Sequence, residues 1–327
     1  MRIHLTKMGD VTPHMIVDYL LSRNKNENIT VLKAIKHFYN HDILPDVNKA
    51  PGTKRNYNKS INHLCNFLKY KKLMSISVKD FKRVHVSKFI DYLRTPILKE
   101  NKVGLNGQSV HSVVKNIKPI FKKLLFEEQI ATNPFEGVKI PFEKAIKPRL
   151  SNEKFIDIVH LDLSADKTLE VYRDIFVLLC YTGLSYCDTI DLRQSDVKLG
   201  LIELRRKKSK VQTKQFLTKQ SINILEKYKD EVPEQRILPK RSLDKLNLNL
   251  KLIAAKTNID FPLSTYAARR FFRQSIFESG IRESLVIKSL MGHTNSNDID
   301  SHYFLVSGDI LKGAKKKLQK HFKKLLK

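Results

Sequence analysis

The sequence is poor in cysteine and has no long apolar run. Its three cysteines, Cys65, Cys180 and Cys187, are an odd number without a CxxC pair, which argues against a disulfide framework and against a zinc ribbon. No apolar run reaches the about 20 residues that a membrane-spanning helix needs. The opening residues MRIHLTKMGD lack the charged and then apolar order of a signal peptide. We therefore expect free core thiols in a cytoplasmic protein that has no membrane partner.

Acidic residues are scarce relative to basic ones. The 327 residues include 61 Lys and Arg but 33 Asp and Glu, which gives a formal net charge of +28. The excess is spread along the chain, as expected where many phosphates are neutralised over a large surface. Nucleic acid is thus the expected partner. An ordinary solvated surface of a lysine-rich protein is the alternative, and membrane-surface binding would need a basic amphipathic helix, which only the C-terminus offers.

The length and the 41% of hydrophobic residues predict two packed domains. Residues 1–28 form a short N-terminal segment, and 29–140 show a helical apolar period throughout. The stretch TKRNYNKSINHLCNFLKYKK, for example, places Tyr57, Ile61, Leu64 and Leu68 on one helix face. The prolines around residues 141–148 mark a linker, and 149–327 form the second domain.

The second domain is predicted to be mainly helical with a small β element. Ser151 is a candidate N-cap of its first helix. The stretch LIELRRKKSKVQTKQFLT alternates like a β-hairpin whose turn is the lysine-rich centre. The expected fold class is therefore mainly α with a small β-hairpin or sheet.

Four segments of the second domain carry a family resemblance. YTGLSYCDTIDL, the lysines of RRKKSK, STYAARRFF and LMGHTNSNDIDSHYF occur in that order, and together they resemble the catalytic domain of tyrosine site-specific recombinases, the integrases of phages and conjugative elements. APGTKRNYNKSINHLCNFLKY and ATNPF are similar to the helical core-binding domain of integrases of Bacteroidetes mobile elements. The resemblance implies a SAM-like core-binding domain over 29–140 and an α+β catalytic domain over 149–327, with 1–28 as a remnant of an arm-binding domain.

Cutting a DNA phosphodiester without a metal requires a nucleophile, cations for the extra charge of the transition state, and an acid for the leaving oxygen. The resemblance assigns the nucleophile to Tyr303, which would form a 3′-phosphotyrosyl link. Arg269 and His293 would hold the phosphate oxygens. Lys208 would protonate the leaving oxygen, with Lys207 and Lys210 as competitors. No cofactor and no metal are expected.

Three further positions complete the expected site. Tyr266 stands where many members of the family have a histidine, three residues before Arg269 on one helix face. Asp188 matches an acidic position that would support the cations. Ser185 follows TGL, where most members carry a first arginine, so one phosphate clamp is missing. Four arginines are candidates to replace it, and the sequence does not rank them: Arg173, Arg193, Arg205 and Arg206.

The resemblance implies a recombinase that integrates, excises or inverts a mobile DNA segment as a homo-tetramer on two double-stranded DNA sites. A nucleoid-associated location and an accessory DNA-bending protein from the host or the element go with this activity. One alternative is a catalytically impaired, recombinase-derived DNA-binding protein, and another is a monomeric type IB topoisomerase.

The C-terminal stretch DILKGAKKKLQKHFKKLLK is expected to form one more amphipathic helix, with its apolar face on a neighbouring protomer. Packing on its own subunit is the alternative. The apolar face comprises Ile310, Leu311, Ala314, Leu318, Phe322 and Leu325.

Overall fold

The computed structural model describes residues 29–96, 104–141, 147–198, 200–208, 212–230, 232, 235–293 and 307–327. The chain divides into two compact units between Ala145 and Ile146, a point within the predicted linker 141–148. The predicted N-terminal segment 1–28, Lys210 and Tyr303 lie outside the described residues. No described helix is long and apolar enough to cross a membrane.

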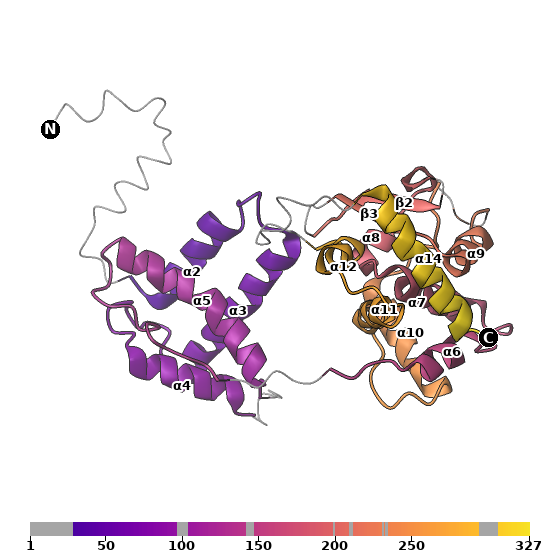
Figure 1. Ribbon diagram of the computed structural model, residues 1–327. Helices are drawn as coiled ribbons and strands as arrows, with labels where there is room; N and C mark the ends of the chain where they lie inside the picture. Colours follow the sequence, from indigo (N-terminus) through magenta and orange to yellow (C-terminus); the bar gives the residue numbers. More distant parts are fainter. Residues whose placement is uncertain are drawn as a thin grey trace, which may run out of the picture. The chain divides into compact units, whose positions relative to one another are not determined.

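The first unit is helical, as its apolar period predicts. Thr30 caps its first helix by accepting a hydrogen bond from Lys33 N, and Asn106 caps its last in the same way through Ser109 N. Pro51 is the first residue of α3, where a missing N–H costs nothing. The elements are α2 (Val31–Phe38), the π-helical turn η1 (Tyr39–Ile43), α3 (Pro51–Tyr70), α4 (Arg83–Arg94) and α5 (Gly107–Phe126) (Figure 1).

The predicted apolar face of α3 is confirmed. Ile61, Leu64 and Leu68 are buried, and Tyr57 packs against the same core. Within this core the Phe67 ring lies 5.3 Å from the Phe89 ring, centroid to centroid, and α3 packs against both α4 and α5. The first unit therefore has a hydrophobic core of its own.

The second unit is built around α7 (Lys167–Thr182), from which eleven residues are buried. Helices α9, α10 and α11 all pack against it. Ser151 caps α6 by accepting from Lys154 N, as predicted. The other helices are α6 (Asn152–Val159), α8 (Tyr186–Thr189), the 3-10 turn η3 (Gln194–Asp196), α9 (Lys219–Lys227), α10 (Leu243–Lys256), α11 (Thr265–Glu278), α12 (Ser284–Met291) and α14 (Gly308–Leu325).

A small antiparallel sheet is the only sheet in the described part of this unit. Its order is β1 (Val197–Lys198), β2 (Leu201–Arg205) and β3 (Gln212–Phe216). Leu201 pairs with Phe216 and Arg205 with Gln212, so β2 and β3 form the hairpin that the alternating sequence predicts. The lysine-rich residues connect these two strands. The fold is thus mainly helical with a small sheet, as expected.

Helix α14 packs on its own subunit. Leu311, Ala314, Leu318 and Phe322 are all buried in the core of the second unit, and the Phe322 ring meets the Tyr181 ring of α7 edge-on at 4.9 Å. Figure 1 shows α14 lying across this unit, where it contacts α11, α12 and β3. The amphipathic helix is confirmed, although Ile310 of its predicted apolar face is 49% exposed. The expected docking on a neighbouring protomer is wrong for this structure, because the rest of the apolar face is already covered in cis.

Candidate active site

The site begins where α7 ends. Gly183 closes the helix in the left-handed conformation with φ of 63°, which non-glycine residues adopt at a cost. A Cβ here would lie 2.0 Å from Cδ1 of Phe272, so the turn needs glycine for space as well. The Gly183 carbonyl accepts a hydrogen bond from Nη1 of Arg269. The turn therefore ties the start of the TGLS segment to α11.

Arg269 lies on the face of α11 that meets α7 and α12. Besides Gly183 O, its guanidinium donates through Nη2 to the carbonyl of Met291, at 2.5 Å. Burial, together with the charge of Arg206, lowers the pKa of Arg269 to about 10. The group is still a cation at neutral pH. Because this cation is partly desolvated, an anion placed beside it would be attracted more strongly than in water.

Arg206, the residue directly after β2, brings a second guanidinium to the same place. It is 5% exposed, and its Nη1 donates to the carbonyls of Met291, at 2.6 Å, and Gly292, at 3.0 Å. Since Arg206 and Arg269 share Met291 O as an acceptor, the two cations lie side by side at the end of α12. We call Arg206, Arg269 and the Met291–His293 turn the arginine cluster.

Asp188 supplies the counter-charge of the cluster. Its side chain is 1% exposed and accepts from Nε of Arg206, at 3.1 Å. It also accepts from the backbone N of Lys207, at 2.9 Å, and from the hydroxyl of Ser185. Asp188 thus holds Arg206 in a fixed orientation and joins the start of the hairpin turn to α8.

His293 follows the turn that ends α12. Gly292 adopts φ of 57° as the C-cap, and a Cβ on it would lie 2.7 Å from Nη1 of Arg206 and 2.8 Å from Oγ1 of Thr213. His293 is exposed. Partial burial and the positive charges of Arg269 and Arg206 lower the pKa of its imidazole, which is therefore neutral at pH 7. A neutral imidazole still donates one N–H hydrogen bond.

The remaining predicted residues lie around the cluster or outside the described residues. Tyr266 is 66% exposed, one helical turn before Arg269 on α11. Lys208 is exposed at the described end of the hairpin turn, whereas Nζ of Lys207 forms an ion pair with Asp191. Of the two lysines, Lys208 is thus the one without an ion pair among the described residues. Tyr303 lies in the segment 294–306, which the structure does not describe.

The structure ranks the four arginines that could replace the missing one. Arg173 pairs with Glu170 and Asp174 along α7, and Arg193 and Arg205 are exposed. Arg206 alone among the four touches Met291 and Asp188. The sequence could not have chosen it, because its partners lie 18 to 86 residues away. The one local signal is its place at the end of a strand, directly before the turn lysines.

Comparisons with known proteins relate the chain to phage integrases. The family model described as "Phage integrase SAM-like domain" matches residues 30–143, which cover the helices of the first unit. A tyrosine recombinase of Agathobacter rectalis is 27% identical over 216 residues, which are 58% of this chain and 69% of that protein.

Solved integrase structures share the fold. A lambda integrase tetramer bound to a Holliday junction aligns with a TM-score of 0.68 and 15% identity, covering 92% of this chain and 89% of the other. The Tn1549 transposon integrase in complex with circular intermediate DNA aligns with a TM-score of 0.62 and 16% identity, covering 88% of this chain and 99% of the other. Both alignments extend over the two units.

Proposed function

We propose that this chain, a member of the tyrosine recombinase, or phage integrase, family, is a site-specific DNA recombinase that integrates, excises or inverts a mobile segment. In this proposal residues 29–140 form the core-binding domain and 149–327 the catalytic domain. The bound substrate is double-stranded DNA, and the strand is cut through a 3′-phosphotyrosyl intermediate on Tyr303.

The arginine cluster is the observation that carries the proposal. Two guanidinium groups, Arg206 and Arg269, lie beside His293 around a single carbonyl, and one buried carboxylate orients Arg206. A guanidinium has more N–H groups than the backbone acceptors occupy, and the remaining ones can meet phosphate oxygens. The transition state of phosphoryl transfer carries more negative charge on these oxygens than the ground state does. The cluster therefore stabilises the transition state more than the bound DNA.

The cleavage step transfers the phosphoryl group from a deoxyribose oxygen to a tyrosine oxygen. The phenolic oxygen of Tyr303 bonds to phosphorus as the bond from phosphorus to the 5′ oxygen breaks. Lys208 gives the leaving oxygen its proton. The phenol loses its proton to solvent and Lys208 takes one up from solvent, so the step has no net proton change. The phosphotyrosyl bond keeps the energy of the broken bond, so the 5′ hydroxyl of another strand reverses the step and joins the strands.

Arg206 takes the role of the absent first arginine in this proposal. Ser185 occupies the family position, but its hydroxyl donates to Asp188. Asp188 in turn orients Arg206 through Nε. The charge missing from the TGLS segment is therefore supplied by the residue that follows β2, and Asp188 and Ser185 act as positioning residues.

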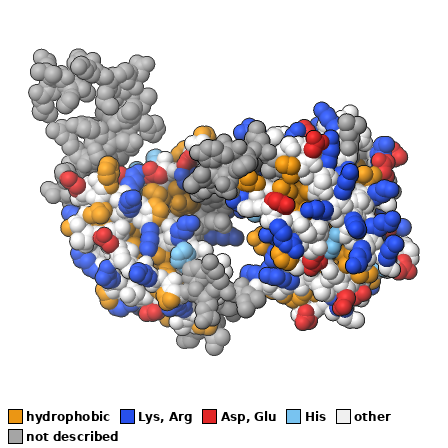
Figure 2. All heavy atoms as spheres, viewed as in Figure 1, with side chains coloured by type: hydrophobic (Ala, Val, Ile, Leu, Met, Phe, Trp, Pro, Cys, Tyr) orange, Lys and Arg blue, Asp and Glu red, His pale blue; other side chains and the backbone are white. Residues whose placement is uncertain are grey.

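The partners and location of the protein follow from this reaction. Joining two sites requires four strand cuts, so we propose a homo-tetramer on two DNA sites, with the lambda integrase tetramer as the structural parallel. The net charge of +28 supports binding to the phosphate backbone, and Figure 2 shows Lys and Arg over the visible faces of both units. We place the protein on the nucleoid in the cytoplasm, with a DNA-bending accessory protein of the host or element as a further partner.

Covalent capture tests the proposal. Duplexes of randomised sequence, each with a nick that lets the cleaved fragment diffuse away, are incubated with the full chain. The wild type is expected to form a denaturant-resistant DNA adduct and to select its own site from the pool. Tyr303→Phe should bind DNA as tightly and form no adduct, because only the phenolic oxygen is removed. If the wild type binds the pool but forms no adduct, the chain is a DNA-binding protein without cleavage activity.

A further inference from the structure

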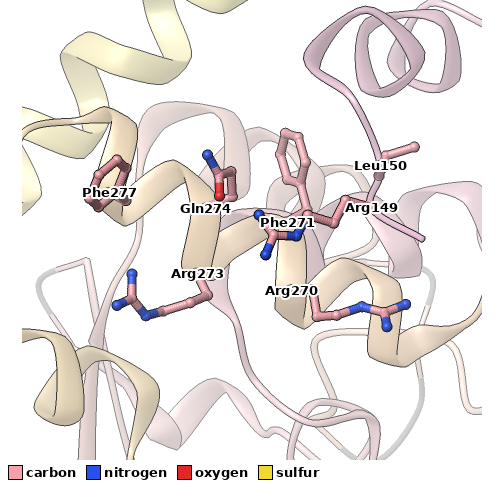
Figure 3. Close-up of a pocket in the computed structure, with 7 residues that line it drawn as sticks. All are labelled: Arg149, Leu150, Arg270, Phe271, Arg273, Gln274 and Phe277. Carbon is pink, nitrogen blue, oxygen red and sulfur yellow. The ribbon is translucent and has the colours of Figure 1, made fainter. Parts of the chain in front are cut away.

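A basic hollow lies on α11 beside the arginine cluster. Its volume is about 530 Å³, and it lies wholly within the second unit. Figure 3 shows that most of the side chains lining it come from α11, while Arg149 and Leu150 come from the segment that leads into α6. The described lining consists of Arg149, Leu150, Arg270, Phe271, Arg273, Gln274 and Phe277. We call this site the α11 hollow.

The α11 hollow carries three positive charges, and no Asp or Glu is among its described lining residues. Two N–H donors of Arg270 lack an acceptor. Its Nε and Nη1 are buried and have no hydrogen-bond partner among the described residues. Its guanidinium carbon lies 5.5 Å from the ring centroid of Tyr266. Removing a cation from water without a counter-charge is unfavourable. A negatively charged ligand would relieve this cost.

The α11 hollow and the proposed cleavage site both use arginines of α11. Arg270 directly follows Arg269, and Arg273 lies four residues after Arg269 on the same helix, about 6 Å along its axis. Arg273 is close enough to His293 for its charge to act on the imidazole. Successive phosphates of one DNA strand are about 3.4 Å apart along the axis of the double helix. The spacing of Arg269 and Arg273 is thus of the order of one to two phosphate steps.

The apolar walls of the hollow suit a sugar-phosphate chain better than a free ion. Phe271 and Leu150 are buried at its floor, and Phe277 is 49% exposed at its edge. The guanidinium of Arg282 covers the Phe277 ring at 3.9 Å, which adds a cation at the rim. Deoxyribose offers apolar carbon atoms between phosphates, so a strand can use both the arginines and the walls.

From these observations we propose that the α11 hollow binds the DNA backbone next to the cleaved phosphate, with Arg270 and Arg273 each neutralising one phosphate. The inference rests on the proposed function in taking DNA as the ligand, but it assigns the contact to residues outside the cluster. A contact here would also fix α11, and with it Arg269, relative to the strand that is cut.

Salt-dependent DNA binding tests the inference without requiring cleavage. The affinity of the full chain for a labelled duplex is measured by fluorescence anisotropy over a range of salt concentrations. Arg270→Gln and Arg273→Gln should each weaken binding about tenfold and reduce the slope of log affinity against log salt by about 0.9. Arg270→Lys keeps the charge and should restore the slope. Lys320→Gln, which removes an exposed charge from α14, is the matched control and should change the slope less.

The result separates this inference from the proposed function. If the glutamine variants are folded by circular dichroism and bind DNA with the affinity and slope of the wild type, the α11 hollow does not hold the backbone, whatever the adduct assay shows. An equal effect of Lys320→Gln would also overturn the inference, because the loss would then reflect net charge alone. A wild type that binds DNA with the expected slopes but forms no adduct would contradict the proposed cleavage and leave this contact standing.

Discussion

Single glycines determine where the polar groups of the site lie. Gly183 and Gly292 both end a helix with positive φ, and each has a side chain packed where its own Cβ would be. Gly183 lies under Phe272, and Gly292 lies against Arg206 and Thr213. The backbone carbonyls that receive the two guanidinium groups are presented at or next to these turns. A glycine at each turn is therefore a requirement of the site as well as of the helix end.

We predict that Gly183→Ala destabilises the protein by about 2–4 kcal/mol, through backbone strain and a clash with the Phe272 ring. Gly313→Ala is the matched control, because Gly313 lies inside α14 with no atom within 4 Å of a Cβ. This second change should stabilise by about 0.5–1 kcal/mol. Urea unfolding measures both. Equal effects of the two changes would show that the close approach to Phe272 is not what requires glycine.

A second prediction concerns Arg206. Arg206→Gln should slow adduct formation about 100- to 1000-fold, because one cation of the transition state is lost. Arg193→Gln removes an exposed arginine outside the cluster and should leave the rate near that of the wild type. Single-turnover adduct assays measure both rates.

The Arg206→Gln experiment needs a control for the loss of the ion pair with Asp188. Without Arg206, the carboxylate of Asp188 stays buried and unpaired, which is destabilising. Adding Asp188→Asn to Arg206→Gln should recover stability but not rate. If the double variant recovers both, Arg206 supports the fold and takes no part in the chemistry.

At the scale of elements, the sequence predicts those features that depend on neighbouring residues. The alternation around the lysine-rich turn predicts the β2–β3 hairpin, and Ser151 is found as the N-cap of α6. The helical period predicts the buried faces of α3 and α14. The surface against which a helix packs depends on residues far away in the sequence. The apolar stripe of α14 therefore could not show that this helix packs on its own subunit. The same limit applies to Arg206, whose sequence neighbours do not distinguish it from Arg205.

Helix α14 leads to a third prediction. Phe322 is fully buried against Tyr181, whereas Ile310 on the same helix is 49% exposed. Phe322→Ala should cost about 3–5 kcal/mol of unfolding free energy, and Ile310→Ala should cost far less. Denaturant unfolding of both variants measures the difference. A small loss for Phe322→Ala would indicate that α14 leaves this groove in solution, as docking on a neighbouring protomer requires.

The junction of α14 with α11 also leads to a pH prediction. His321 lies 3.7 Å from Oε2 of Glu278, and burial lowers the pKa of its imidazole below 6.5, an effect that Glu278 opposes and Lys324 adds to. The unfolded chain therefore takes up a proton at a higher pH than the folded one. The contribution of this pKa difference to the free energy of unfolding is fully present above about pH 6.5 and is lost as the pH falls. His321→Gln should make unfolding free energy fall less steeply between about pH 7 and pH 5, and an unchanged steepness would contradict this.

At the scale of the whole molecule, two compact units share one strongly basic chain. The first unit matches the SAM-like family model, and the second carries the arginine cluster and the α11 hollow. The proposed reaction needs both units, because the first unit would bind the DNA site while the second attacks a single phosphate. The positive charge spread over both units fits a substrate that both contact.

Peptide mapping of the covalent complex tests whether Tyr303 is the nucleophile. Complexes are trapped on nicked DNA in EDTA and digested with nuclease and trypsin. The tryptic peptide 289–312 contains Tyr303 as its sole tyrosine, and mass spectrometry should find the residual nucleotide there. Tyr181 is a poor competitor, because it is 2% exposed and burial raises the pKa of its phenol, whereas Tyr266 is exposed. A nucleotide on Tyr266, or on any residue other than Tyr303, would show that Tyr303 is not the nucleophile.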